Sequence, residues 1–336
     1  LPDHRLLARF TYTSGVAARV LLILPMVPGL GTQINGAKIW IALGPFSFQP
    51  GEIAKVLLVI TFAGYLVVHR DALALAGRRV VFVDLPRGRD FGPILVMWLV
   101  SLGILILQRD LGSSLLFFGL FLGMLYVATE RPGWLVVGAL MFFGGAALAI
   151  NAFSHVQNRV DIWLHPFADP SGNGYQLVQA LYGLGWGGLM GRGLGEGMPQ
   201  QVPYAESDFI IAAIGEELGL TAVIAVLLLF GVIVERALRA ALISRDGFGK
   251  LVATGLAAVF TLQVFVVVGG VTRLIPLTGL TTPFLSYGGS SLVANWVIIA
   301  ILLRISDQAR RPLPDLNEDE ESPDEQATQM IKVSGR

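Results

Sequence analysis

Residues 251–272 read LVATGLAAVFTLQVFVVVGGVT and contain no Lys, Arg, Asp, Glu or His. A helix needs about 20 mostly apolar residues to cross the hydrocarbon core of a bilayer. This stretch is long enough to do so, and it predicts a membrane-spanning helix.

Comparable stretches recur along the chain, at 20–37, 91–108, 111–129, 132–154, 218–234 and 274–303. The last one opens with a portion rich in Pro, Gly and Ser, so its helix is expected at about 289–304. An eighth span, about 50–68, is interrupted by Glu52 and Lys55. We therefore predict an all-α polytopic membrane protein, a helical bundle with about eight spans.

The composition of the 336 residues agrees with this class, since 54% are hydrophobic and 14% are charged. Soluble domains contain about 25% charged residues. Lys+Arg and Asp+Glu number 24 each, so net charge gives no reason to expect a nucleic-acid partner. There is no cysteine, which excludes disulfides, thiolate metal sites and cysteine nucleophiles.

Basic residues fall mostly in alternate loops, which orients the chain in the membrane. One set of loops holds fifteen: Arg5, Arg9, Arg70, Arg78, Arg79, Arg87, Arg89, Arg131, Arg236, Arg239, Arg245, Lys250, Arg304, Arg310 and Arg311. The other set holds five: Lys38, Arg109, Arg159, Arg192 and Arg273. This asymmetry predicts a plasma-membrane protein whose two termini are cytoplasmic and whose long 152–208 loop is outside.

The ends of the chain differ from this membrane domain, which we place at 1–311. The sequence opens at Leu1 without a methionine, close to its first span, so we expect an N-terminal truncation. Residues 312–336 contain three prolines and the cluster Glu318–Glu321, a composition that cannot build a core. We predict a disordered, acidic cytoplasmic tail there.

The 152–208 loop is the most informative segment, because long loops of this kind are functional or disordered and its aromatic residues argue against disorder. Leu177, Leu181 and Leu184 recur at helical spacing and indicate a helix at the membrane interface. Asp208 lies where the loop re-enters the bilayer. It is either a helix N-cap or a base whose pKa is raised by partial burial, with Glu206 and Ser207 as rivals for the second role.

Polar residues at two further places suggest function. Glu52 and Lys55 are three residues apart and share a helix face, so they form either a structural ion pair or part of a wet cavity. Gln49-Pro50-Gly51 before them predicts a helix start. In the Pro- and Gly-rich segment 276–291 the backbone must be buried in protein or line a cavity, and hydroxyls are supplied there by Ser286, Ser290 and Ser291.

Several charged residues receive a local interpretation. Arg109 and Asp110 lie in a three-residue connection, where a salt bridge between them is expected. Of Glu216 and Glu217, one is expected to face a cavity and the other to cap or pair. Arg273 is a candidate anion ligand. The glycines of 191–197 do not form a nucleotide-binding motif, and the four histidines lack metal-ligand spacing, so no metal site is predicted.

Six blocks of sequence together resemble the SEDS family, typified by RodA and FtsW. They are NGAKIWIALGPFSFQPGEIAK (35–55), QRDLGSSLLF (108–117), NRVDIWLHPFADPSGNGYQLVQAL (158–181), GRGLGEG (191–197), YAESDFIIAAIGEELG (204–219) and IPLTGLTTPFLSYGGSS (275–291). Family members have ten spans, and the first block here falls after what would be the third. The LTGLTTP wording and the acidic tail look actinobacterial and RodA-like.

The resemblance implies a peptidoglycan glycosyltransferase that polymerises lipid II, in elongation or division, next to a class B penicillin-binding protein. It implies that Asp208 is the essential aspartate and favours its role as general base. It also implies that Glu52 and Lys55 form the polar pair of the central cavity, and that Arg159 is the basic residue opening the large loop. We add Ser286, Ser290 and Ser291 as substrate-binding candidates. Three positions differ from the residues that are common in the family. Gly51 stands in place of Ser, Ser207 in place of Thr, and Val267 in place of Asn.

Other features of the expected reaction stay open. Arg159, Lys55 or a divalent cation (Mg²⁺ or Mn²⁺) held partly by the substrate's phosphates are alternatives for stabilising the departing diphosphate of undecaprenyl-linked glycan. A lipid II flippase and a non-catalytic scaffold for a transpeptidase are the rival functions. A secondary transporter is disfavoured because no internal repeat is evident.

Overall fold

The computed structural model describes residues 5–34, 37–44, 46–74, 78–80, 83–85 and 88–311. The predicted disordered tail, 312–336, lies outside these residues. The described part is mostly helical, and short strands occur at two places.

The N-terminal part alternates helices with two small antiparallel sheets, whose strand orders are β1-β2-β3 and β4-β5. The helices are α1 (Arg5–Arg9), α2 (Thr11–Ile23), the 3-10 turn η1 (Leu24–Met26), α3 (Pro50–Ala74) and α4 (Gly88–Leu107). The strands are β1 (Gly31–Ile34), β2 (Ala37–Leu43), β3 (Phe46–Phe48), β4 (Arg78–Val80) and β5 (Val83–Leu85).

In the rest of the described chain the regular elements are all helices, joined by loops. Its α-helices are α5 (Leu111–Thr129), α6 (Gly133–Ala152), α7 (Ser154–Leu164), α8 (Tyr175–Gly187), α9 (Ile210–Ile243), α10 (Gly247–Val271) and α11 (Gly289–Arg310). Its 3-10 turns are η2 (Pro166–Ala168) and η3 (Pro199–Gln201).

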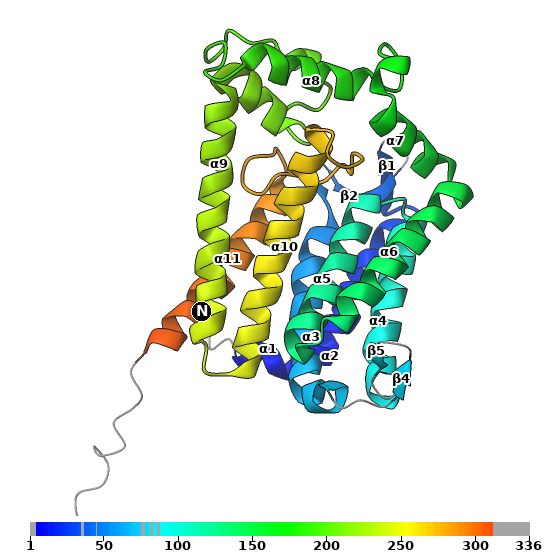
Figure 1. Cartoon of the computed structure of the whole chain (residues 1–336), viewed down its shortest axis with the longest axis vertical. Coiled ribbons are helices and arrows are strands. Elements are labelled where there is room, and N and C mark those ends of the chain that lie inside the picture. Colours follow the sequence, from blue (N-terminus) through cyan, green and yellow to red (C-terminus); the bar gives the residue numbers. More distant parts are fainter. Residues whose placement is uncertain are drawn as a thin grey trace, which may run out of the picture.

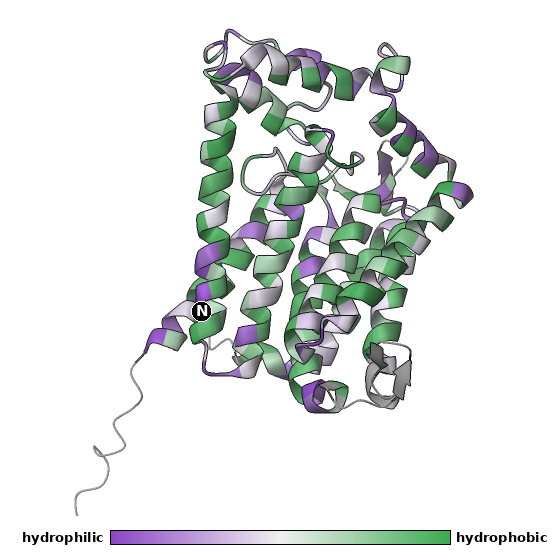
Figure 2. Cartoon of the chain, in the orientation of Figure 1, coloured by the Kyte–Doolittle hydropathy of each residue, from purple (hydrophilic) through white to green (hydrophobic). Residues whose placement is uncertain are grey.

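Six of the described helices are long and apolar enough to cross a membrane, and two shorter apolar helices cover Thr11–Met26 and Gly92–Leu107. Figure 2 shows hydrophobic residues along most of α6, α9 and α10 and hydrophilic ones on α7. The stretches predicted at 111–129 and 132–154 coincide closely with α5 and α6, and the helix start at Pro50 is confirmed. The count of eight spans stays a prediction.

The predicted first span, 20–37, is wrong in its position. The helix is α2, which ends at Ile23 and is followed by η1 and by β1, starting at Gly31. Pro25 and Pro28 interrupt an α-helix, and Gly29 has a φ of 86°, which is not helical, although none of the three carries a charge. The helix extends instead in the other direction and includes Arg19, which the search for charge-free runs had excluded.

The core of the bundle lies around α3 and α10. In their most apolar stretches 72% and 67% of residues are buried, against 11% in α6 and 17% in α9. Close backbone approach allows α2 to pack on α3, since a Cβ on Gly64 would overlap the side chain of Thr11. The outer faces of α6 and α9 are left for lipid.

The segment from α7 to η3 arches over one end of the bundle, the end at which the β1–β2 sheet and the α10–α11 connection also lie (Figure 1). The helix predicted from Leu177, Leu181 and Leu184 is confirmed as α8. Helix α8 packs on the first turns of α9 so closely that a Cβ on Gly187 would overlap the carbonyl oxygen of Gly215.

Helix α9 is interrupted at Gly219, whose φ of 80° and ψ of 177° are not helical. The backbone of the glycine-rich segment after α8 fills this break. Arg192 N–H donates to the Glu216 carbonyl (3.0 Å), Gly193 N–H to Glu217 (2.9 Å), and Leu220 N–H donates back to Gly188 (2.9 Å). The glycines of GRGLGEG thus attach the arch to α9.

Candidate active site

A cavity of about 1220 Å³ opens beneath the arch. Its walls come from β2, the α4–α5 turn, α7, α8, the residues before α9, and the connection between α10 and α11. Of the predicted site residues, Asp208, Arg159 and Ser286 line it. Glu52, Lys55, Ser290 and Ser291 are not among the lining residues.

Asp208 lies just before α9, and its carboxylate faces the α10–α11 connection. A Cβ added to Gly279, which has a φ of 74°, would lie 3.6 Å from Oδ2 of Asp208. The N-cap of α9 is Phe209, and it makes no side-chain cap bond. The pKa of Asp208 is raised to about 6, because burial and, to a smaller extent, the charge of Glu206 outweigh the Ser207 hydrogen bond and the charge of Arg159, which lower it.

Arg159 projects from α7 into the same cavity. Its Nη1 donates a hydrogen bond of 2.8 Å to the carbonyl oxygen of Leu277, in the α10–α11 connection. Burial lowers the pKa of Arg159, and the negative charges of Asp110 and Asp208 act in the opposite direction. The guanidinium therefore interacts electrostatically with two carboxylates, and one of its nitrogens is fixed by the backbone.

The α10–α11 connection holds the Asp208 segment in place. Oγ of Ser286 donates to the carbonyl oxygen of Ser207 (2.5 Å) and accepts from the Thr282 backbone N–H (2.7 Å). Tyr287 N–H donates to the Glu206 carbonyl (2.7 Å). Ser286, predicted to bind substrate, thus has a visible task of its own, which is to hold the backbone at Ser207, directly before Asp208.

Glu52 and Lys55 form a buried ion pair of 2.6 Å on α3. Lys55 Nζ also donates to Oε1 of Gln263 (2.8 Å), and Nε2 of Gln263 donates to the Thr281 carbonyl (2.8 Å). Because Thr281 lines the cavity, the pair is linked to the cavity wall through one glutamine. The assignment of Glu52 and Lys55 to substrate binding stays a prediction.

Ser291 belongs to the same polar network. Its Oγ lies 2.8 Å from Oγ1 of Thr281 and accepts from Nδ2 of Asn295 (3.3 Å). Ser290 and Ser291 are both buried in the first turn of α11. Their contact with substrate stays a prediction, and the polar network runs from Glu52 through Lys55, Gln263, Thr281 and Ser291 to Asn295.

Asp110 is a site residue whose role the sequence interpretation missed. The expected local salt bridge with Arg109 is not found among the ion pairs of the described residues. Asp110 instead caps α5 by accepting the Ser113 N–H (2.9 Å), and it lines the large cavity. Burial raises its pKa. Asp is one of several residues favoured at a helix N-cap, and the cavity that Asp110 also lines is formed by segments distant in the sequence.

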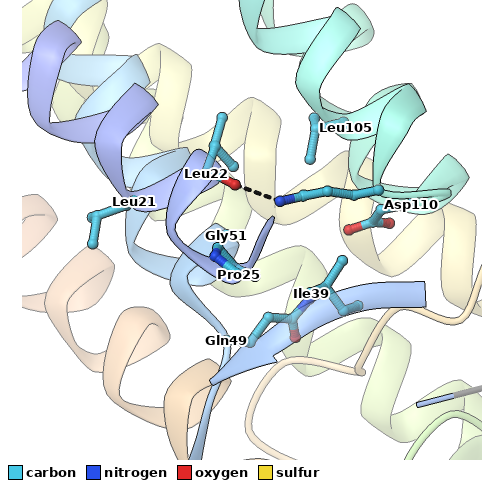
Figure 3. A pocket seen from close by; sticks show the side chains of 9 residues that line it. Leu21, Leu22, Pro25, Ile39, Gln49, Gly51, Leu105 and Asp110 are labelled. Carbon is cyan, nitrogen blue, oxygen red and sulfur yellow. Dashed lines mark hydrogen bonds between the residues drawn. The ribbon is translucent and has the colours of Figure 1, made fainter. Parts of the chain in front are cut away.

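Asp110 also connects this site to a smaller cavity. Figure 3 shows it with Gln49 on the wall of a space of about 10 Å³, room for about one water molecule. The dashed line there marks the hydrogen bond to the Leu22 carbonyl oxygen, donated by the Gln108 side chain. Gln49 and Asp110 line both cavities.

Two further charged candidates, Glu216 and Arg273, bind backbone groups of the arch. Glu216, buried, accepts from the Met198 N–H (2.9 Å) and lies 3.7 Å from Arg192. Arg273 donates to the carbonyl oxygens of Trp163 (2.8 Å) and Leu164 (2.7 Å), so it anchors α7 rather than presenting itself to an anion. No group of three or more His, Asp or Glu residues within the described ranges is placed to hold a metal ion. A divalent cation therefore stays a prediction.

Comparison with known proteins gives one family match and several similar chains. The family model described as "Cell cycle protein", covering FtsW, RodA and SpoVE, matches residues 3–311. The "Peptidoglycan glycosyltransferase RodA" of Mycobacterium bovis is 52% identical over 93% of this chain and 67% of its own length. A chain from "a peptidoglycan synthase complex" superimposes with a TM-score of 0.74 at 29% identity, over 93% of this chain and 85% of that one. The rod shape determining protein RodA of Thermus thermophilus gives a TM-score of 0.61 at 27% identity, over 93% and 82%.

The fold and these matches define an integral membrane protein of helical-bundle architecture. It belongs to the FtsW/RodA/SpoVE family of cell cycle proteins, which confirms the resemblance to the SEDS family.

Proposed function

We propose that this protein is a peptidoglycan glycosyltransferase that polymerises lipid II, with Asp208 as the general base. The observation that carries the proposal is the position of Asp208, a half-buried carboxylate with a pKa of about 6 on the wall of a 1220 Å³ cavity. A base works best when its pKa lies near the operating pH. The names of the mycobacterial relatives support the same activity.

The chemistry needs one carboxylate. Asp208 accepts the proton of the acceptor sugar's hydroxyl while that oxygen attacks C1 of the donor sugar. The bond between C1 and the diphosphate oxygen breaks, and its electron pair leaves with the diphosphate, which needs no proton from an acid. Attack from the opposite side inverts the configuration at C1. This differs from glycosidases, which use two carboxyl groups.

Arg159 is suited to stabilise the charge that develops on the departing diphosphate. Guanidinium groups bind phosphate oxygens in a forked geometry, and one nitrogen of Arg159 is already fixed to Leu277. Where a divalent cation takes part, it would reach this end of the cavity with the diphosphate and share the phosphate oxygens with Arg159.

Orientation and partners belong to the same proposal. The charge asymmetry of the loops supports an active side outside the plasma membrane and cytoplasmic ends for this chain. A class B penicillin-binding protein is proposed as the transpeptidase partner, because a similar chain comes from a complex that coordinates "polymerization and crosslinking".

The test is lipid II polymerisation by the purified protein together with its cognate transpeptidase. Asp208→Ala should abolish the glycan ladder while the protein stays folded. Asp161→Ala, a change of an exposed acid on the neighbouring α7, should leave the ladder intact. A well-folded, active Asp208→Ala protein would refute the base. No ladder from any variant, with lipid II crossing proteoliposomes, would favour a flippase, and neither product nor transport would favour a scaffold.

A further inference from the structure

The cavity has a second guanidinium that the proposed chemistry has not used. Arg109 lies in the turn between α4 and α5 and lines the cavity together with Asp110 and Arg159. It is exposed, and within the described residues no carboxylate lies within ion-pair distance of it. A cation is therefore presented to the cavity without an acidic partner in the described part of the chain.

Arg109 has a backbone conformation that favours glycine. Its φ is 62°, in the left-handed region, where helices usually end with glycine. The turn is well made, since the Arg109 N–H donates to Ile106 (3.0 Å) and the Asp110 N–H to Leu105 (3.0 Å). Lys38 N–H of β2 donates to the Gln108 carbonyl (3.4 Å) and ties the turn to the sheet. A glycine would satisfy the same turn with less strain, so the turn alone does not call for arginine.

Arg109 and Arg159 line the same cavity. Burial lowers the pKa of His155 on α7, and the charges of Arg109 and Arg159 both lower it further. Asp110, the carboxylate closest along the chain, is occupied by the Ser113 N–H as a helix cap. The part of the cavity lining that comes from the α4–α5 turn and α7 therefore carries two guanidinium groups.

The cavity also has acidic lining residues. Glu206 and Asp208 lie on its wall in the segment before α9, and Arg159 interacts electrostatically with both Asp110 and Asp208. A cavity that presents a base together with two guanidinium groups matches a reaction in which a proton is removed from one atom while negative charge develops on another.

Resting on the proposed function, we propose that Arg109 pairs with Arg159 to bind the diphosphate of the lipid-linked donor and to distinguish it from a monophosphate. Arg159 is half-buried and fixed by its bond to the Leu277 carbonyl, so it takes the phosphate next to the sugar. Arg109, exposed at the α4–α5 turn, takes the second phosphate, next to the lipid. Two guanidinium groups on separate elements require two phosphates to be used together.

The test measures binding apart from catalysis, with geranylgeranyl diphosphate and geranylgeranyl monophosphate as probes for the detergent-purified protein. Arg109→Gln should weaken diphosphate binding by about tenfold and change monophosphate binding far less. Arg109→Lys should be intermediate, because the charge stays and the fork is lost. In polymerisation assays Arg109→Gln should raise KM for the lipid-linked donor more than it lowers kcat.

A glycine variant separates the side chain from the turn. Arg109→Gly should lose diphosphate affinity like Arg109→Gln, although its unfolding temperature equals or exceeds that of the wild type. Glu130→Gly is the matched control, since Glu130 has a φ of 56° at the end of α5 and does not line the cavity. That change should leave diphosphate binding and polymerisation unaltered.

Two results would overturn the inference: unchanged diphosphate affinity in Arg109→Gln, or equal losses for both probes. Its failure is distinguishable from failure of the proposed function. A wild-type protein that makes glycan while Arg109→Gln binds diphosphate normally refutes the Arg109 role alone. A wild-type protein that makes no glycan refutes the glycosyltransferase, whatever the binding data show.

Discussion

Two acid–base pairs lie near the α10–α11 connection. One is a direct ion pair, and in the other the two charged groups do not touch. Glu52 and Lys55 touch at 2.6 Å, with side-chain exposures of 6% and 2%. Asp208 and Arg159 act on each other across a cavity, and Arg159 uses one nitrogen to bind the Leu277 carbonyl instead. A closed pair neutralises itself and holds helices together. A separated pair leaves the carboxylate poorly compensated, which keeps its pKa high and its base function available.

The largest expected effect comes from breaking the closed pair. Lys55→Met leaves Glu52 buried without its cation and Gln263 without its donor, and it should lower the free energy of unfolding by about 3–5 kcal/mol. Thermal unfolding of the detergent-purified protein measures it.

The double variant Glu52→Gln/Lys55→Met is the control. With both charges removed, stability should return to within about 1 kcal/mol of the wild type. A single variant as stable as the wild type would show that this pair does not hold the bundle together, and would strengthen its assignment to substrate binding.

Neutralising Asp208, the acid of the separated pair, should increase the stability of the fold. The folded-state pKa of Asp208 is about 6 against an ordinary value of 3.8, so between these values the folded protein binds more protons than the unfolded chain. Ionised Asp208 therefore destabilises the fold above pH 6. Asp208→Asn should be more stable than the wild type by about 1–3 kcal/mol at pH 8.

This gain should shrink as the pH falls through 6 and vanish below 3.8. Paired unfolding curves at pH 8 and pH 5 measure it, and wild-type polymerisation should decline over the same range as the base is protonated. A variant whose advantage does not depend on pH would contradict a raised pKa for Asp208.

The smallest expected effect concerns the α10–α11 connection, which contacts the segments of both Asp208 and Arg159. Ser286→Ala removes the bond to the Ser207 carbonyl and leaves that oxygen without its donor. We expect a loss of about tenfold in kcat with little change in KM, equivalent to about 1.4 kcal/mol. Thr129→Ala, which removes a hydroxyl bond to the Leu125 carbonyl within α5 and away from the cavity lining, is the control and should leave kcat unaltered. An unchanged Ser286→Ala rate would show that Asp208 is positioned by other contacts.

The sequence predicted the parts of the molecule that depend on local chemistry. Charged Asp110 and Glu130 delimit α5, and the apolar run between them was found to the residue. Leu177, Leu181 and Leu184 revealed α8 through their spacing. The first span was misplaced because a charge-free run was equated with a helix, although Pro25 stops one and Arg19 does not.

The candidate site was predicted only in part, because its geometry is non-local. Asp208 and Arg159 could be named from the family motifs, and the structure places both on one cavity. That Ser286 contacts the Ser207 backbone, or that Lys55 reaches Gln263, cannot be read from spacing, since these pairs are 79 and 208 residues apart. Arg109 looked like a local salt-bridge partner because the turn that faces it into the cavity is visible only in three dimensions.

The distance along the chain between Ser207 and Ser286 sets an order in time. A ribosome adds about 5–20 residues per second, so about 4–16 s separate the synthesis of these two residues, which lie 79 apart. During that interval the Asp208 segment has neither Gly279 nor Ser286 beside it, and α11 has yet to be inserted. We therefore expect the proposed base of a nascent chain to reach its final position only after the α10–α11 connection has been made, so a shorter chain should lack the activity.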